Sequence, residues 1–197
     1  MKVIILGSGT SQGVPIIGCK CATCTSENPR DKRLRVSVFL EIEPADSSDG
    51  LKILIDTTPD FRQQMLVNQI DDIDAVLYTH HHVDHIMGMD DIRQINQLHK
   101  KSVDIYGNKL TIDHIKKTFS YVFDTNTYKG GGIPNISTNV ITLDPFKVKG
   151  IEIIPLEFDH GSLKVFGYRI GDFAYMTDCS FIPEPEFTKL NGLKVLV

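Results

Sequence analysis

The chain has 197 residues, of which 41% are hydrophobic and 23% charged, and its formal net charge is −4. This length supports one compact domain with a substantial core, and an acidic balance without a long basic run argues against a large nucleic-acid footprint. No apolar stretch approaches the roughly 20 residues that cross a bilayer, and the apolar start is too short for a signal peptide. We therefore expect one cytoplasmic domain over residues 1–197, with neither a membrane nor a nucleic acid as partner.

The first third of the chain is predicted to form strands and turns. Residues 3–6 are a short apolar run before a glycine turn, and residues 11–28 form a long irregular loop. Residues 36–43 alternate apolar and polar side chains, as a half-buried strand does. A turn-forming cluster at 46–50 precedes another apolar run at 52–55, which predicts a β-hairpin.

The middle of the chain alternates helices with strands. Asp60 is a suitable N-cap for a helix over residues 60–70. A buried strand at 75–78 ends at a histidine-rich segment. Helices are predicted over 90–98 and 109–123, on either side of a strand at 103–106.

The last third reads as β structure after a glycine-rich loop at 128–134. Strands are predicted at 140–143, 151–158, 163–170 and 173–176. Residues 193–197 read as a buried strand that has only begun, and a domain rarely ends inside a core strand. From this we expect that the sequence is truncated at its C-terminus.

Three of the four cysteines, Cys19, Cys21 and Cys24, lie within six residues. In a reducing compartment such spacing indicates a metal site more often than a disulfide. A structural zinc site is closed by four ligands, so three thiolates predict a structural Zn²⁺ that needs a fourth ligand from elsewhere. The alternative is three incidental thiols.

The segment from Thr79 to His85 holds four of the seven histidines of the chain. In an extended segment, successive side chains point to opposite sides, so His80 and His82 lie on the same side and can bind one metal ion together. Asp84 and His85 can reach a second metal ion. Imidazole and carboxylate suit Zn²⁺, and also Mn²⁺ or Fe²⁺. The alternative is a solvated polar loop.

Two residues farther along the chain are candidates to complete this site. His160 and Asp178 each follow a predicted strand, and the loops at strand ends often build functional sites. Taken singly, either residue would more often be a cap or a turn residue.

The pattern His80-x-His82-x-Asp84-His85, followed by His160 and Asp178, resembles the signature of the metallo-β-lactamase superfamily. Residues 6–15, together with the cysteine triplet, resemble the branch of phosphoribosyl cyclic-phosphate phosphodiesterases. The resemblance implies an α/β fold, a four-layer αββα sandwich. It further implies two active-site metal ions, zinc or manganese: His80, His82 and His160 on the first, Asp84 and His85 on the second, and Asp178 bridging both.

The same resemblance implies two histidines that this sequence does not contain, since no histidine follows His160. One would complete the second metal set, and the other would close the cysteine site. Both are placed by the family near the C-terminus, which agrees with the expected truncation.

The expected function is a metal-dependent phosphodiesterase acting on a small cyclic phosphate or nucleotide-like phosphodiester. Two adjacent ions would activate a hydroxide for attack on phosphorus, and Asp84 would be the catalytic residue that orients it. Arg93 could bind a substrate phosphate or, equally, form an ion pair with Asp90.

Two alternatives stay open. One is an RNA-processing endonuclease-like hydrolase, and the other is a non-catalytic protein of cofactor biosynthesis on the same fold. A homodimer is also left open.

Overall fold

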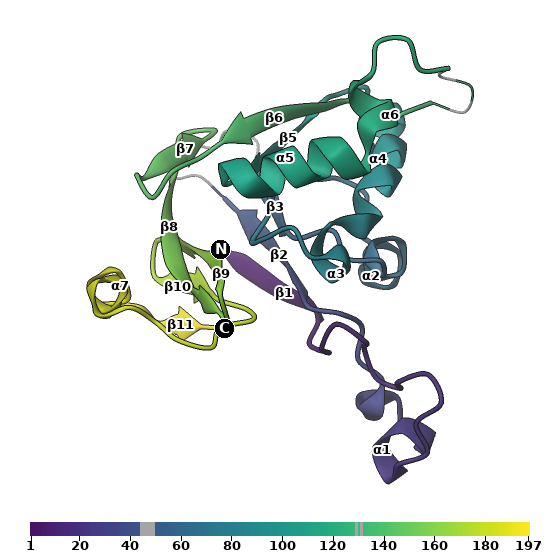
Figure 1. Cartoon of the computed structure of the whole chain (residues 1–197), viewed down its shortest axis with the longest axis vertical. Coiled ribbons are helices and arrows are strands. Elements are labelled where there is room, and N and C mark those ends of the chain that lie inside the picture. Colours follow the sequence, from purple (N-terminus) through teal and green to yellow (C-terminus); the bar gives the residue numbers. More distant parts are fainter. Residues whose placement is uncertain (44–49, 129, 131) are drawn as a thin grey trace.

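The structure is a computed structural model that describes residues 1–43, 50–128, 130 and 132–197. Two β-sheets pack face to face, with several helices on the outer face of the first sheet and one short helix beside the outer face of the second (Figure 1). The expected four-layer αββα sandwich is therefore confirmed. Most of the expected turn at 46–50, and positions 129 and 131 of the expected loop at 128–134, lie outside the described residues.

The first sheet has the strand order β1–β2–β3–β4–β5–β6. Its first three strands are antiparallel, and β3 to β6 are parallel. On β2, Val38 and Leu40 face the second sheet while Phe39 faces the helices, so the strand is buried on both faces rather than half-buried as the sequence predicts. The strands are Lys2–Gly7, Ser37–Ile42, Leu51–Ile55, Ala75–Leu77, Val103–Gly107 and Ile136–Val140.

The second sheet has the order β11–β10–β9–β8–β7. All its neighbours are antiparallel except β10 and β11. The outer face of this sheet packs against the segment around the short helix α7, Glu184–Lys189. The strands are Phe146–Val148, Ile151–His160, Leu163–Ile170, Phe173–Tyr175 and Val195–Leu196.

Two strand predictions differ from the structure. The strand expected at 140–143 is wrong: β6 ends at Val140 and β7 begins at Phe146. The last strand exists as β11, but Val195 and Leu196 are 48% and 54% exposed rather than buried. They pair with β10 at the edge of the sheet, where little of the protein covers their side chains.

The helices predicted over 60–70 and 90–98 are present, and the helix expected over 109–123 is interrupted at Phe119. Helix α7 was not predicted. No described helix is long and apolar enough to cross a membrane. The helices are Ala22–Thr25 (α1), Phe61–Asn68 (α2), Val83–Ile86 (α3), Ile92–His99 (α4), Lys109–Thr118 (α5), Ser120–Phe123 (α6) and Glu184–Lys189 (α7), with 3₁₀ turns at Pro29–Asp31 (η1) and Met87–Asp91 (η2).

An N-terminal arm, residues 14–33, extends away from the sandwich and carries α1 (Figure 1). Val14 and Arg33 close its base, because each backbone N–H donates to the other residue's carbonyl, at 2.8 and 2.9 Å. The three clustered cysteines therefore lie in a segment that both leaves and rejoins the first sheet at one place.

Candidate metal centre

The histidine-rich segment is held at its start by the second sheet. It follows β4, and the hydroxyl of Tyr168 on β9 donates to the Tyr78 carbonyl at 2.6 Å. The backbone N–H of Phe166 donates to the Thr79 carbonyl at 2.9 Å. Buried backbone groups are satisfied by these bonds, and the segment is thereby fixed against β9.

Helix α3, which carries Asp84 and His85, is docked onto the loop after β3. Thr57 donates its backbone N–H to the His85 carbonyl at 2.8 Å, and its carbonyl accepts from the Gly88 N–H at 2.9 Å. A Cβ on Gly88 would lie 2.2 Å from the Thr58 carbonyl oxygen. Only glycine allows this close approach.

On the far side of the centre, the end of β8 is tied to the loop after β10. The Asp159 carbonyl accepts from the Ser180 backbone N–H at 2.7 Å and from its hydroxyl at 2.9 Å. These bonds bring His160 beside Asp178. The φ of Asp178 is +56°, a strained value for an aspartate that is often found at functional sites.

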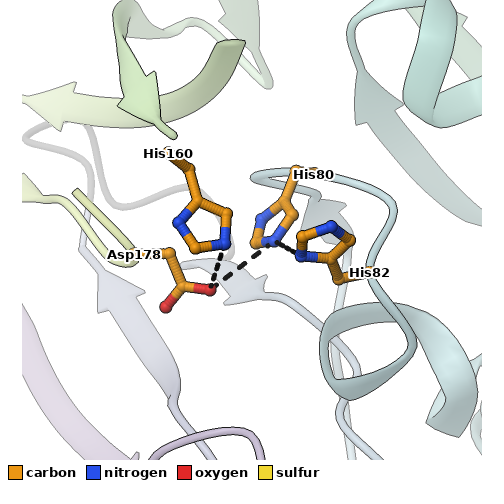
Figure 2. Close-up of side chains that lie close together, drawn as sticks. All are labelled: His80, His82, His160 and Asp178. Atoms are coloured by element: carbon orange, nitrogen blue, oxygen red, sulfur yellow. Dashed lines mark hydrogen bonds and ion pairs between the residues drawn. The ribbon is translucent and has the colours of Figure 1, made fainter. Parts of the chain in front are cut away.

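The first group of converging side chains is His80, His82, His160 and Asp178 (Figure 2). One donor atom from each lies within 4.8 Å of the others. His80 Nε2 is 2.9 Å from His82 Nδ1 and 3.6 Å from Asp178 Oδ2, and His160 Nε2 is 3.8 Å from the same oxygen.

The second group is Asp84, His85 and Asp178, again within 4.8 Å of one another. His85 Nε2 is 3.4 Å from Asp84 Oδ2 and 3.2 Å from Asp178 Oδ2. Asp178 thus belongs to both groups, and all six residues predicted as ligands are brought together. Their roles as ligands stay predictions.

Sequence reasoning missed Asp56, which is fully buried behind this cluster. Its carboxylate accepts from His85 Nδ1 at 2.7 Å and from both the backbone N–H and the hydroxyl of Thr79 at 2.8 Å. Its position directly after β3, beside the strand that leads into the histidines, was the available signal. Asp56 fixes the His85 ring so that Nε2 faces the cluster.

The charges of the site suit a bound cation. Burial, together with the charges of His85 and His82, lowers the pKa of His80 to about 3, so its ring is neutral near neutral pH. The hydrogen bond from His85 lowers the pKa of Asp178 to about 2. Burial lowers the pKa of His85, but the carboxylates around it outweigh burial and raise it to about 12.

These observations fit divalent metal ions. Three imidazoles and a shared carboxylate form a donor set typical of Zn²⁺ or Mn²⁺. The three carboxylates around His85 supply an excess of negative charge that a metal ion would balance.

A cavity of about 400 Å³ opens over the cluster. His82, Asp84, His160 and Asp178 line it, together with residues 8–11 and Val36. Arg93, predicted to bind a phosphate, is not among the lining residues. Its guanidinium pairs with Asp90 at 3.0 Å, as the second interpretation of Arg93 expected.

The cysteine triplet forms a separate cluster in the N-terminal arm. Sulfur atoms of Cys19, Cys21 and Cys24 lie within 4.8 Å of one another. The backbone N–H of Cys24 lowers the pKa of the Cys21 thiol, which favours the thiolate that binds metal. The sulfur of Cys24 accepts from the Ile16 N–H at 3.4 Å.

Comparison with known proteins places this geometry in a family. The sequence model described as "Beta-lactamase superfamily domain" matches residues 52–197. A crystal structure described as a new diphosphatase from the PhnP family is 40% identical, with a TM-score of 0.85 over 98% of this chain and 72% of that chain.

Two curated relatives are longer proteins. An octanoyltransferase from Porphyromonas gingivalis is 41% identical over 100% of this chain and 38% of its own length. A coenzyme PQQ synthesis protein B from Methylobacterium radiotolerans is 33% identical over 63% of this chain and 42% of its own length. The chain therefore spans about two fifths of the curated relatives that it matches.

Proposed function

We propose that this chain, which belongs to the beta-lactamase superfamily and to its PhnP-like branch, is a metal-dependent hydrolase of small phosphodiesters. The observation that carries the proposal is the pair of ligand groups that share Asp178. Two divalent ions bound there would lower the pKa of a water molecule and neutralise charge on a phosphate.

His80, His82 and His160 would hold one ion and Asp84 and His85 the other, with Asp178 between the two. Zinc and manganese both fit these donors. The second set has three ligands from the described residues, and the family resemblance implies a further histidine for it.

Asp84 is the residue that we assign to orient the attacking water. Burial raises the pKa of its carboxyl, but the hydrogen bond and charge of His85 outweigh burial and lower it below its usual range. The side chain therefore stays an anion. It lines the cavity, where its carboxylate can accept a hydrogen bond from water and hold it toward the substrate.

The cavity supports a small substrate, since about 400 Å³ lies at the lower end of ligand pockets, which run from roughly 300 to 1,000 Å³. A cyclic phosphate or a single nucleotide unit fits this size. The diphosphatase name of the 40% identical structure supports phosphoryl chemistry rather than β-lactam cleavage. The octanoyltransferase name belongs to a protein whose larger part lies outside the matched segment.

For the cysteine triplet we propose a structural zinc. Three thiols within 4.8 Å of one another provide three of its four ligands. Such a site cannot activate water, so its role would be to hold the N-terminal arm together. Closely spaced free thiols also support a reducing compartment, and we propose the cytoplasm.

A second candidate is a non-catalytic role in cofactor biosynthesis. The match to a coenzyme PQQ synthesis protein B favours it. In that case the protein would hold its metal ions and hydrolyse no phosphodiester.

The proposal is tested with the metal-loaded protein, bis(4-nitrophenyl) phosphate and 2′,3′-cyclic nucleotides. We expect turnover, its loss in His82→Ala, and its persistence in Asp113→Asn, a surface control on α5. Metal analysis of the same samples, together with Cys21→Ser, should show separate losses of active-site metal and arm zinc. Normal metal content without turnover would favour the cofactor-biosynthesis role.

A further inference from the structure

A groove lies between helices α2 and α4, outside the metal centre. Its volume is about 420 Å³, and the buried side chains of Phe61, Met65 and Ile95 form its floor. Leu66 and Leu98 also line it, and these side chains are 57% and 63% exposed. This α2–α4 groove therefore presents apolar surface to solvent on the outer face of the first sheet (Figure 1).

The two helices run in the same direction along the groove. Both are crossovers between parallel strands of the first sheet, α2 between β3 and β4, and α4 between β4 and β5. Their C-terminal ends meet where His99 Nε2 donates to the Asp71 carbonyl at 2.9 Å. One end of the groove thus lies at the start of both helices, beside Arg62 and Asp91, and the other lies beside Asp71.

Arg62 is the unpaired charge at the first end of the groove. It is exposed, and it forms no ion pair within the described residues. Arg93, which lines the same end, is neutralised by Asp90 at 3.0 Å. Asp91 is half-buried there and forms no ion pair with either arginine. The exposed charge of this end is therefore positive.

Asp71 is the corresponding charge at the other end. It is exposed, and the lysines near it pair instead with Asp72 and Asp74. Leu66 lies between the two charged ends, one helical turn from Arg62 and on the same side of α2. Along α2 the groove is therefore positive, then apolar, then negative.

We infer that the α2–α4 groove binds a second copy of this chain through a twofold interface in which the two α2 helices run antiparallel. A surface with opposite charges at its ends and leucine between them is complementary to itself when reversed, as an interface between two identical patches requires. Leu66 of each copy enters the groove of the other, and Arg62 of each copy faces Asp71 of the other.

The charges favour a second copy over a small apolar ligand. Such a ligand would cover the leucines but leave both Arg62 and Asp71 without a partner, whereas a reversed copy pairs both of them. In this arrangement the buried leucines stabilise the dimer, and the ion pairs at the rim fix its orientation. The inference does not depend on the proposed hydrolysis, because neither group of metal ligands lines this groove.

Sedimentation velocity of the zinc-loaded protein tests the apolar part of the interface. TCEP is present so that the free cysteines of different molecules form no disulfides. We expect a species of twice the 22.1 kDa chain mass at micromolar concentration. Leu66→Gln should weaken association by about tenfold or more. Val67→Gln is the matched control, because Val67 is an exposed residue of the same helix that does not line the groove, and it should leave association unchanged.

Charge reversal tests the antiparallel orientation. Arg62→Asp should weaken association about 10- to 100-fold, because two carboxylates then face each other at both ends of the interface. Asp71→Arg should have the same effect, because it brings two guanidinium groups together. The double variant restores opposite charges, so its dissociation constant should return to within about threefold of the wild-type value.

Three results would overturn the inference. The first is a wild-type protein that stays monomeric, and the second is a dimer that Leu66→Gln and both charge reversals leave intact. The third is a double variant that associates as weakly as the single variants. Far-UV circular dichroism should match the wild-type spectrum in every variant, and recovery in the double variant distinguishes a broken interface from a damaged fold.

Discussion

Asp56 gives the sharpest prediction, because a single atom exchange should disturb the centre without changing its shape. The carboxylate is fully buried, with Oδ1 accepting from the Thr79 backbone N–H and Oδ2 accepting from His85 Nδ1 at 2.7 Å. Because this hydrogen bond keeps a proton on Nδ1, Nε2, which lies beside Asp84 and Asp178, is the nitrogen that can exchange its own proton for a metal ion.

Asp56→Asn should reverse this arrangement. Oδ1 must stay an oxygen because a backbone N–H points at it, so the new NH₂ group replaces Oδ2 and faces His85 Nδ1. Nδ1 of His85 must then accept a hydrogen bond from this NH₂ group, so the ring proton moves to Nε2. A protonated Nε2 has no lone pair with which to bind a metal ion. Loss of a carboxylate that hydrogen-bonds to a metal-binding histidine lowers metal affinity by about 10- to 100-fold, or roughly 1.4–2.7 kcal/mol.

The assay is a zinc titration against a chelating competitor that resolves the separate sites. In Asp56→Asn, we expect the zinc affinity of the group containing His85 to fall, while the zinc affinity of the cysteine cluster in the N-terminal arm stays unchanged. Asp113→Asn, an exposed aspartate paired with Lys109, controls for the loss of one negative charge. Unchanged affinities in a folded Asp56→Asn protein would refute the role assigned to Asp56.

Two further predictions concern stability. Gly88→Ala places a methyl group 2.2 Å from the Thr58 carbonyl oxygen. We therefore expect the free energy of unfolding, measured by denaturant titration, to fall by about 1–3 kcal/mol. The control is Gly50→Ala, whose Cβ would meet no atom of the described residues closer than 3.4 Å; equal losses in the two variants would contradict the prediction. Burial raises the pKa of Asp74, but Lys101 and Lys149 outweigh it and lower the pKa below its usual value. The stabilisation exists above the unfolded-state pKa and disappears as pH falls through the folded one. Asp74→Asn should therefore lose about 1–3 kcal/mol at neutral pH and little at strongly acidic pH, and a difference independent of pH would contradict this assignment.

Local patterns predicted much of the fold. Strands β2, β3, β8 and β9 are rich in apolar residues and are bounded by turn residues, so their positions could be predicted although most of their side chains are buried rather than alternating. The strand expected at 140–143 failed because β6 carries polar residues such as Ser137 and Asn139, which hide the alternation. The predicted helix over 109–123 failed at Phe119, whose ring is buried in the core beside the helices while its backbone leaves the helical region.

The site was predictable where its residues cluster in sequence or follow a strand. His80 to His85 and the later His160 and Asp178 fall into that class. Asp56 also follows a strand, β3, but its role depends on a hydrogen bond to His85 across 29 residues, which its position alone does not predict.

We propose that the two ligand groups sharing Asp178 each hold a metal ion. Anomalous diffraction at the zinc edge from crystals of the zinc-loaded protein tests it most directly. We predict two peaks on either side of Asp178, each about 2.0–2.2 Å from its imidazole and carboxylate ligands. A density map without a peak between His80, His82 and His160 would contradict the account.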